Sequence, residues 1–148
     1  NDVARIHTGY LLYRGALNAA ARWQAEQESR ISQRVRTSFH QWFASTLLHV
    51  YALTVRLRPE GTLGNDVAQE VFTHFWRDVD LGLQRIGYRN HPLVLGSKLR
   101  KMVRVYYGAV VALDDALSRG AAPGADALLA DVLYCNVYVP PLAATSSC

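Results

Sequence analysis

Histidines are the side chains most able to do acid–base or metal chemistry in this chain, and their spacing gives them no shared site. They are His7, His40, His49, His74 and His91, and none stands near a cysteine or at the spacing of a metal-ligand pair. A zinc or haem site would have to be assembled from distant segments. His49 falls in line with Trp42 and Leu53 on a predicted helix, which favours a histidine bonded at the edge of the core over a ligand. The sequence predicts no metal and no cofactor.

One histidine–carboxylate pair has a spacing that is also found in catalytic sites. His74 and Asp78 are four residues apart, so on a helix they could share a hydrogen bond, as two members of a catalytic triad do. No nucleophile in a suitable setting can be named for them. Asp114 and Asp115 are adjacent and would point about 100° apart on a helix, which suits capping or partner contact better than a shared proton. A glycine-rich phosphate loop is also missing from the sequence, so the residues favour an interaction domain over an enzyme.

Basic residues gather in one part of the chain, although the net charge is only +4. Between residues 77 and 104 only Asp78 and Asp80 accompany a basic set made of Arg77, Arg85, Arg89, Lys98, Arg100, Lys101 and Arg104. The last four form a basic face on an amphipathic helix, which could meet RNA phosphates, anionic lipid headgroups or an acidic protein. Composition does not rank these partners, and ordinary solvated helix faces are the alternative.

The stretch Ser38–Arg58 is the element around which we expect the others to pack. Large apolar side chains recur along it at helical spacing over roughly five turns: Phe39, Trp42, Phe43, Leu47, Val50, Leu53 and Leu57. Ser38 or the residue before it can cap the start, and arginines near the end suit the carbonyl terminus. Pro59 and Gly61 then stop the helix. An aromatic load of this size predicts a central helix.

Further helices are predicted over Asp2–Gln24, from Asn65 or Asp66 to about Ile86, over Leu93–Arg119 and over Ala125–Tyr138. A loop over residues 59–64 (PEGTLG), a terminating Gly87 and a link over residues 120–124 separate them. The pattern does not decide whether residues 24–36 continue the first helix. Gly9 and Gly15 in that helix could let a neighbouring helix come close.

These elements predict an all-α, single-domain helical bundle of five or six helices around a central aromatic-rich helix. Residues 1–138 are expected to form the helical domain and residues 139–148 a C-terminal tail. No uninterrupted apolar run reaches about 18 residues, so no segment is expected to span a bilayer.

A set of short motifs resembles the ubiquinol–cytochrome c chaperone family, whose members assist assembly of cytochrome b. The motifs, in chain order, are Ser38-Phe39, Trp42-Phe43, Leu48-His49-Val50, Val55-Arg56-Leu57-Arg58 and His74-Phe75-Trp76-Arg77-Asp78-Val79. The resemblance covers about residues 37–138. The chain departs from the family at Arg36, where an acidic residue is common, and over Ile86–His91, where bacterial members often carry an acidic, glycine-rich turn.

The resemblance implies a non-catalytic chaperone that binds newly synthesised cytochrome b during biogenesis of the respiratory bc1 complex. It also implies a small helical partner protein, a location in mitochondria on the matrix side of the inner membrane, and for some members contact with the mitochondrial ribosome. His49, Arg56, Asp78 and Asp114 occupy matched polar positions and are the implied partner-binding residues. Arg85, Lys98, Arg100, Lys101 and Arg104 form the basic face that could meet anionic lipid or ribosomal RNA.

Two other functions stay open at this point. One is a structural helical subunit of a large mitochondrial assembly, either the ribosome or a respiratory complex. The other is an enzyme whose site forms between helices, which would require a deep polar pocket joining His49 or His74 to carboxylates.

Overall fold

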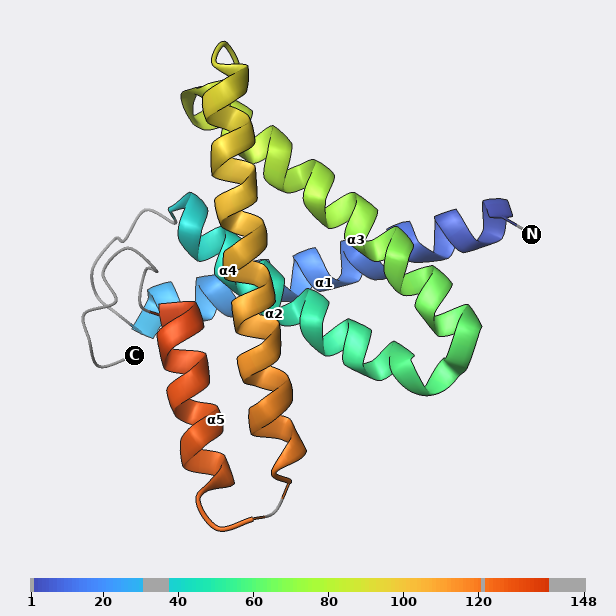
Figure 1. The fold of residues 1–148 in the computed structure, drawn as a ribbon, viewed down its shortest axis with the longest axis vertical. Coiled ribbons are helices and arrows are strands. Elements are labelled where there is room, and N and C mark those ends of the chain that lie inside the picture. The colour runs from blue at the N-terminus through green and yellow to red at the C-terminus, as the bar shows by residue number, and fades with distance from the viewer. Residues whose placement is uncertain (1, 31–37, 121, 139–148) are drawn as a thin grey trace.

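Helices make up all the secondary structure that the computed structural model describes, over residues 2–30, 38–120 and 122–138 (Figure 1). The elements are α1 (Asp2–Arg30), α2 (Phe39–Leu57), η1 (Arg58–Glu60), α3 (Gly61–Leu83), η2 (Gln84–Tyr88), α4 (Pro92–Ser118), α5 (Ala125–Leu133) and η3 (Tyr134–Tyr138). The predicted all-α class is therefore confirmed. The number of helices depends on whether the short segments η1–η3 are counted, so the expected count of five or six is not confirmed.

The start of α2 lies where the sequence predicts, because Ser38 caps it. The Ser38 hydroxyl accepts a hydrogen bond from the Gln41 amide at 3.2 Å, and the Gln41 side chain accepts one from the Ser38 amide at 3.0 Å. This reciprocal pair satisfies backbone N–H groups that the first turn of a helix leaves without partners. Arg56 lies in the last turn of α2, as expected.

The predicted loop over residues 59–64 is wrong. Pro59 lies in η1 and Gly61 already begins α3, so α2 and α3 are joined without an irregular segment. Gly61 makes the change of direction with a φ of 65°, a left-handed value that side chains with a Cβ rarely adopt. Neither Asn65 nor Asp66 caps α3, because the helix begins about one turn earlier than predicted.

The end of α3 and the start of α4 form a hairpin that projects from the molecule. Gly87, at a φ of 121°, interrupts the helical backbone as predicted, and the His91 amide donates to the Tyr88 carbonyl at 3.1 Å across the turn. α4 begins at Pro92. Figure 1 shows α3 and α4 close together at this end and diverging from it, while α5 runs beside the last part of α4.

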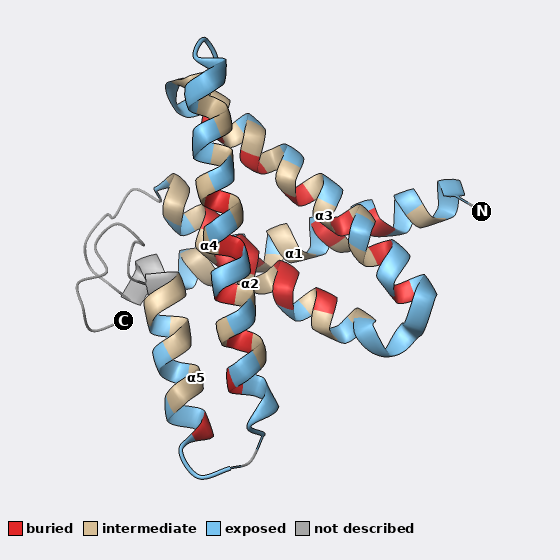
Figure 2. Ribbon diagram, in the orientation of Figure 1, coloured by how far each residue is buried: buried red, intermediate tan, exposed pale blue. Residues whose placement is uncertain are grey.

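The hydrophobic core lies where α1, α2, α3 and α4 cross (Figure 2). Its buried side chains are Tyr13 from α1, Phe43, Leu47 and Val50 from α2, Val71, Phe75, Val79 and Leu83 from α3, and Met102, Tyr106 and Ala109 from α4. α3 supplies four of these buried side chains and α2 supplies three. The expectation that residues 39–57 form the one central helix is therefore not confirmed.

α1 extends beyond its predicted end at Gln24 and continues to Arg30, so the undecided stretch begins as helix. Residues 31–37 and the predicted tail over residues 139–148 lie outside the described residues, and the domain boundary at residue 138 stays a prediction. In the described ranges, no helix is both long enough and apolar enough to cross a membrane.

Candidate partner-binding cleft

A cleft of about 580 Å³ lies among α2, α3 and α4. Its lining residues are Thr54 and Arg58 at the end of α2 and η1, Asn65, Ala68, Gln69, Phe72, Thr73 and Trp76 on α3, and Tyr106, Tyr107 and Val110 on α4. The α3 residues recur at intervals of three and four, so they share one face of the helix. Figure 1 shows α3 and α4 diverging from their hairpin, and the residues that line the cleft come from these two helices and from the end of α2.

Three aromatic rings form one wall of the cleft. Tyr106 lies edge-on to Phe72, with ring centroids 5.5 Å apart, and edge-on to Trp76, with centroids 5.6 Å apart. Offset and edge-on arrangements of this kind are favourable beyond the area that they bury. Burial raises the pKa of the Tyr106 hydroxyl well above its usual value, so the ring presents a neutral surface. The wall therefore suits apolar side chains.

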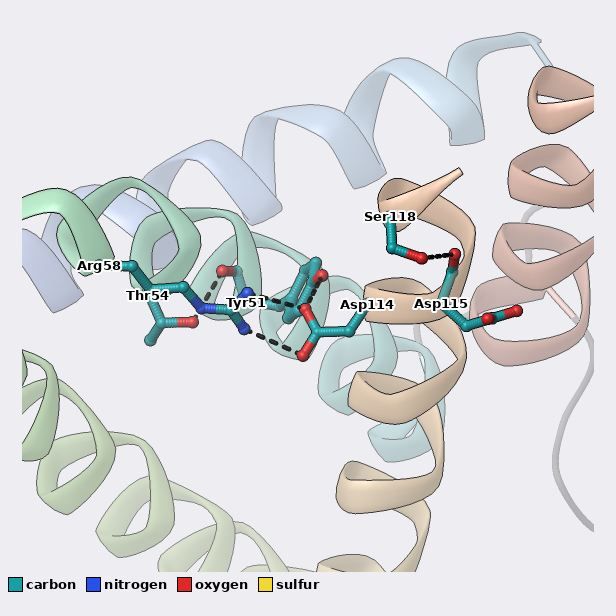
Figure 3. A network of polar contacts seen from close by, with 6 residues as sticks. All are labelled: Tyr51, Thr54, Arg58, Asp114, Asp115 and Ser118. Carbon is teal, nitrogen blue, oxygen red and sulfur yellow. Dashed lines mark hydrogen bonds and ion pairs between the residues drawn. The ribbon is translucent and has the colours of Figure 1, made fainter. Parts of the chain in front are cut away.

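The edge of the cleft next to α2 is closed by a charged network. The Arg58 guanidinium binds both oxygens of the Asp114 carboxylate, at 2.9 Å and 3.1 Å, and the Tyr51 hydroxyl donates to Asp114 at 2.6 Å. Figure 3 shows these contacts joining the end of α2 to α4. A two-point arginine–carboxylate pair fixes relative orientation as well as distance. The network therefore holds the two helices at a set separation where the cleft opens.

The electrostatics of this network follow from the same contacts. The hydrogen bond from Arg58 holds the pKa of the Asp114 carboxyl below its ordinary value of 3.8, and the bond from Tyr51 adds to that effect. Burial, together with the hydrogen bond to Asp114, raises the pKa of Tyr51 to about 12. The contact between these two side chains is therefore intact across the neutral range of pH.

Asp115 does not share the surroundings of Asp114. Its carboxylate pairs with Arg119 at 3.0 Å, and its backbone carbonyl accepts a hydrogen bond from Ser118 at 2.7 Å (Figure 3). The two adjacent carboxylates thus engage different partners, as their predicted divergence requires.

Arg56 and Asp114 were both predicted as contact residues, but the structure does not bring them together. Arg56 is exposed and pairs with Glu60 at 3.1 Å, one turn along the chain. Arg58 binds Asp114 instead, and sequence reasoning missed both Arg58 and Tyr51 as members of the site. Their spacing of seven residues, which places both on one face of a helix, was the available signal.

His49 and Asp78 lie away from the cleft and bond inside the molecule. The His49 ring donates from Nδ1 to the Ser45 carbonyl at 2.8 Å within α2, and Tyr13 of α1 donates to Asp78 at 2.8 Å. The hydrogen bond that His74 and Asp78 could share by their spacing is not formed. Neither ring nitrogen of His74 has a hydrogen-bond partner among the described residues, and the ring packs beside Tyr10 and Tyr13 instead.

The basic face lies at the opposite end of α4 from the network. Arg85 precedes the hairpin turn, Lys98 lies 5.6 Å from the centre of the Tyr88 ring, and Arg100, Lys101 and Arg104 follow along α4. None of these five side chains forms an ion pair with a carboxylate of the described residues.

The side chains that line the cleft are mainly uncharged. Among the described residues that line it, Arg58 is the one charged side chain, and neither His49 nor His74 is present. No group of three or more histidine, cysteine, aspartate or glutamate side chains in the described ranges could hold a metal ion.

Comparison with known proteins gives one family. The model of the ubiquinol-cytochrome C chaperone family matches residues 32–145. Ubiquinol-cytochrome c reductase complex assembly factor 1 is 28% identical in Mus musculus and 29% identical in Homo sapiens, each over 80 residues. The Xenopus laevis protein of that name is 26% identical over 100 residues.

The chain spans only part of each of these relatives. The matches to the mouse and human proteins cover 54% of this chain and 26% of the relative, and the match to the Xenopus protein covers 68% and 46%. No solved structure matches the chain.

Proposed function

The chain belongs to the ubiquinol–cytochrome c chaperone family, and from this premise we propose that it is a non-catalytic assembly chaperone for ubiquinol–cytochrome c reductase, the respiratory complex III. The observation that carries the proposal is the family match over residues 32–145, because this range contains every residue that lines the cleft. The relatives are named as assembly factors of the same complex, which supports the same function.

Newly synthesised cytochrome b is the proposed client. A membrane protein exposes apolar segments before it is assembled, and a groove on a chaperone can cover one apolar face of such a segment. The aromatic wall of Phe72, Trp76 and Tyr106 offers that cover, and Tyr107 and Val111 extend it along the exposed side of α4. A volume of about 580 Å³ suits a row of side chains from one helix face.

The predicted contact residues take two kinds of role in this proposal. Asp114, held by Arg58, keeps the cleft open to a set width, and the exposed Arg56 lies at the same end of α2 for contact with a partner. His49 and Asp78 already bond inside the molecule, so we assign them the positioning of their helices. A small helical protein is the proposed second subunit, and the mitochondrial matrix side of the inner membrane is the proposed location.

Capture of translation products tests the proposal. After labelling of mitochondrial translation products, purification of the chain should capture labelled cytochrome b. Tyr107→Glu should reduce the captured amount by about tenfold, since an aromatic contact at the centre of an interface is worth that much or more. Leu11→Glu is the matched control, because Leu11 is also exposed but lies on α1, away from the cleft.

Two outcomes would count against the proposal. Absence of cytochrome b from the captured material would show that it is not the client. Equal capture by Tyr107→Glu and Leu11→Glu would show that the cleft is not the binding site. Stable purification with a mature ribosome or respiratory complex at fixed stoichiometry would instead support a structural subunit.

A further inference from the structure

The end of the α3–α4 hairpin exposes aliphatic side chains that nothing in the described molecule covers. We use the term basic tip for residues 84–101, which comprise η2, the turn and the first turns of α4. Within it Leu93 is 88% exposed, Ile86 54% and Val94 43%. Figure 2 shows this end as exposed and projecting beyond the core. Aliphatic groups gathered at a protruding end indicate a surface that is buried elsewhere.

Positive charge accompanies these aliphatic side chains along the chain, with no acidic residue in the same stretch of sequence. The sequence has no aspartate or glutamate between Asp80 and Asp114. Asp80 is bonded by Gln84 at 2.8 Å, and Asp114 is bound by Arg58 at the far end of the cleft. The cations of the basic tip are therefore available to an external anion.

The cations lie on both sides of the aliphatic end. Lys98 lies over the Tyr88 ring and, with Lys101 and Ile86, lines a small pocket next to the start of α2. The Arg100 guanidinium lies beside the backbone of Gly96, and Lys98 and Arg100 point about 200° apart around α4. Along the helix axis these cations follow Leu93 by roughly 8–12 Å. This distance is close to the Debye length in physiological salt, so a charged surface that Leu93 touches would still attract them.

From this arrangement we propose that the basic tip docks end-on onto an anionic lipid bilayer. Leu93, Ile86 and Val94 enter the boundary between headgroups and acyl chains, and Arg85, Arg89, Lys98 and Arg100 bind lipid phosphates around them. RNA would use the same cations but would gain nothing from three exposed aliphatic side chains, because its recognition surfaces are phosphates, sugars and stacked bases. The aliphatic end therefore favours lipid over RNA.

The docking would also set the position of the cleft. Tyr106 and Tyr107 follow Leu93 by about 20 Å along α4, so the cleft would stand beside the membrane surface and clear of the hydrocarbon. This inference adds a membrane-binding surface to the proposed function. It rests on the proposed function for the identity of the membrane, which is the inner mitochondrial membrane.

Sedimentation with vesicles tests the basic tip. The purified chain should sediment with phosphatidylcholine vesicles that contain phosphatidylglycerol and stay in solution with phosphatidylcholine alone, and rising salt should release it. Leu93→Asn should weaken binding by about tenfold and Arg89→Gln by about fivefold, since each cation near such a surface contributes roughly that factor. Both residues are exposed in the turn region, so neither change should unfold the protein.

Matched controls lie elsewhere on the surface. Leu11→Asn changes an exposed leucine on α1, and Arg22→Gln changes an exposed arginine on the same helix. Both should bind anionic vesicles as the unchanged chain does.

The proposal is overturned if anionic vesicles do not retain the chain, or if Leu93→Asn binds like Leu11→Asn. Tighter binding to duplex RNA than to anionic vesicles, unaffected by Leu93→Asn, would assign the surface to RNA and overturn it as well. Failure here is distinguishable from failure of the chaperone proposal, because capture of cytochrome b by the Tyr107 variants uses a different surface.

Discussion

Arg58 and Asp114 form the contact on which the geometry of the cleft depends most directly. Their side chains are 52% and 41% exposed, so solvent screens the pair and its contribution to the free energy of unfolding is at most about 1 kcal/mol. The value of the contact is geometric, since a two-point bond restricts how α2 and α4 rotate against each other. Variants of this pair should therefore change partner binding more than stability.

The pKa of Tyr51 responds to its contact with Asp114. Its pKa of about 12 lies above the ordinary value of 10.0, so the contact contributes stability fully below pH 10 and loses it as pH rises toward 12. The lowered pKa of Asp114 acts at the other end, because its contribution is present above about pH 4 and is lost as pH falls further. Between these limits the network is intact.

Asp114→Asn should lower the pKa of Tyr51 part of the way toward its ordinary value of 10.0. Burial, the largest cause of the raised pKa, remains, but the hydrogen bond to the carboxylate and its negative charge are lost. Ultraviolet titration of tyrosinate, compared with the unchanged chain, measures this. Asp115→Asn is the control, since Asp115 pairs with Arg119 and does not contact Tyr51. Superimposable titration curves for the unchanged chain and Asp114→Asn would contradict the assigned contact.

At the scale of elements, α1 and α3 come together at a glycine. A Cβ on Gly9 would overlap the side chain of Glu70, whereas a Cβ on Gly15 would meet no atom of the described residues within 4 Å. Gly9 is buried and Gly15 is exposed. The sequence-based expectation of close approach is therefore right for Gly9 and wrong for Gly15. The residue type alone does not tell which face of a helix meets a neighbouring helix.

Gly9→Ala should destabilise the fold by about 1–3 kcal/mol, because the added methyl group must displace α3. Gly15→Ala should be neutral or stabilising by up to about 1 kcal/mol, because alanine is the better helix former where there is space. Urea denaturation followed by circular dichroism measures both. Equal midpoints for the two variants would show that the helices do not cross at Gly9.

At the scale of the whole molecule, Phe75 joins three helices. It is fully buried, and its ring centroid lies 5.7 Å from that of Phe43 on α2 and 6.0 Å from that of Tyr106 on α4. The same layer of rings is both the centre of the core and the support beneath the cleft. Stability and the shape of the cleft are therefore coupled.

Phe75→Ala should lower the free energy of unfolding by about 3–5 kcal/mol, because it leaves a cavity among α2, α3 and α4. Tyr107→Ala, at an exposed position on α4, should change it by no more than about 0.5 kcal/mol. Thermal or urea unfolding gives both values. A small effect of Phe75→Ala would mean that the three helices do not share one core.

Local pattern determined the all-α class, the capped start of α2, the break at Gly87 and the family resemblance. Each depends on residues close together in the chain, such as Ser38 with Gln41, or on motifs whose order is visible directly. The direct connection from α2 to α3 was missed because Pro59 and Gly61 fit a tight helical junction as well as a loop.

Tertiary structure alone decided which side chains meet. Arg58 rather than Arg56 binds Asp114, and Tyr13 rather than His74 binds Asp78, since these partners are separated by 56 and 65 residues and their contact depends on how helices cross. The cleft has the same origin, because no short stretch encodes the divergence of α3 from α4. Helical periodicity specifies which side of a helix is apolar, but the packing of all the helices specifies what that side faces.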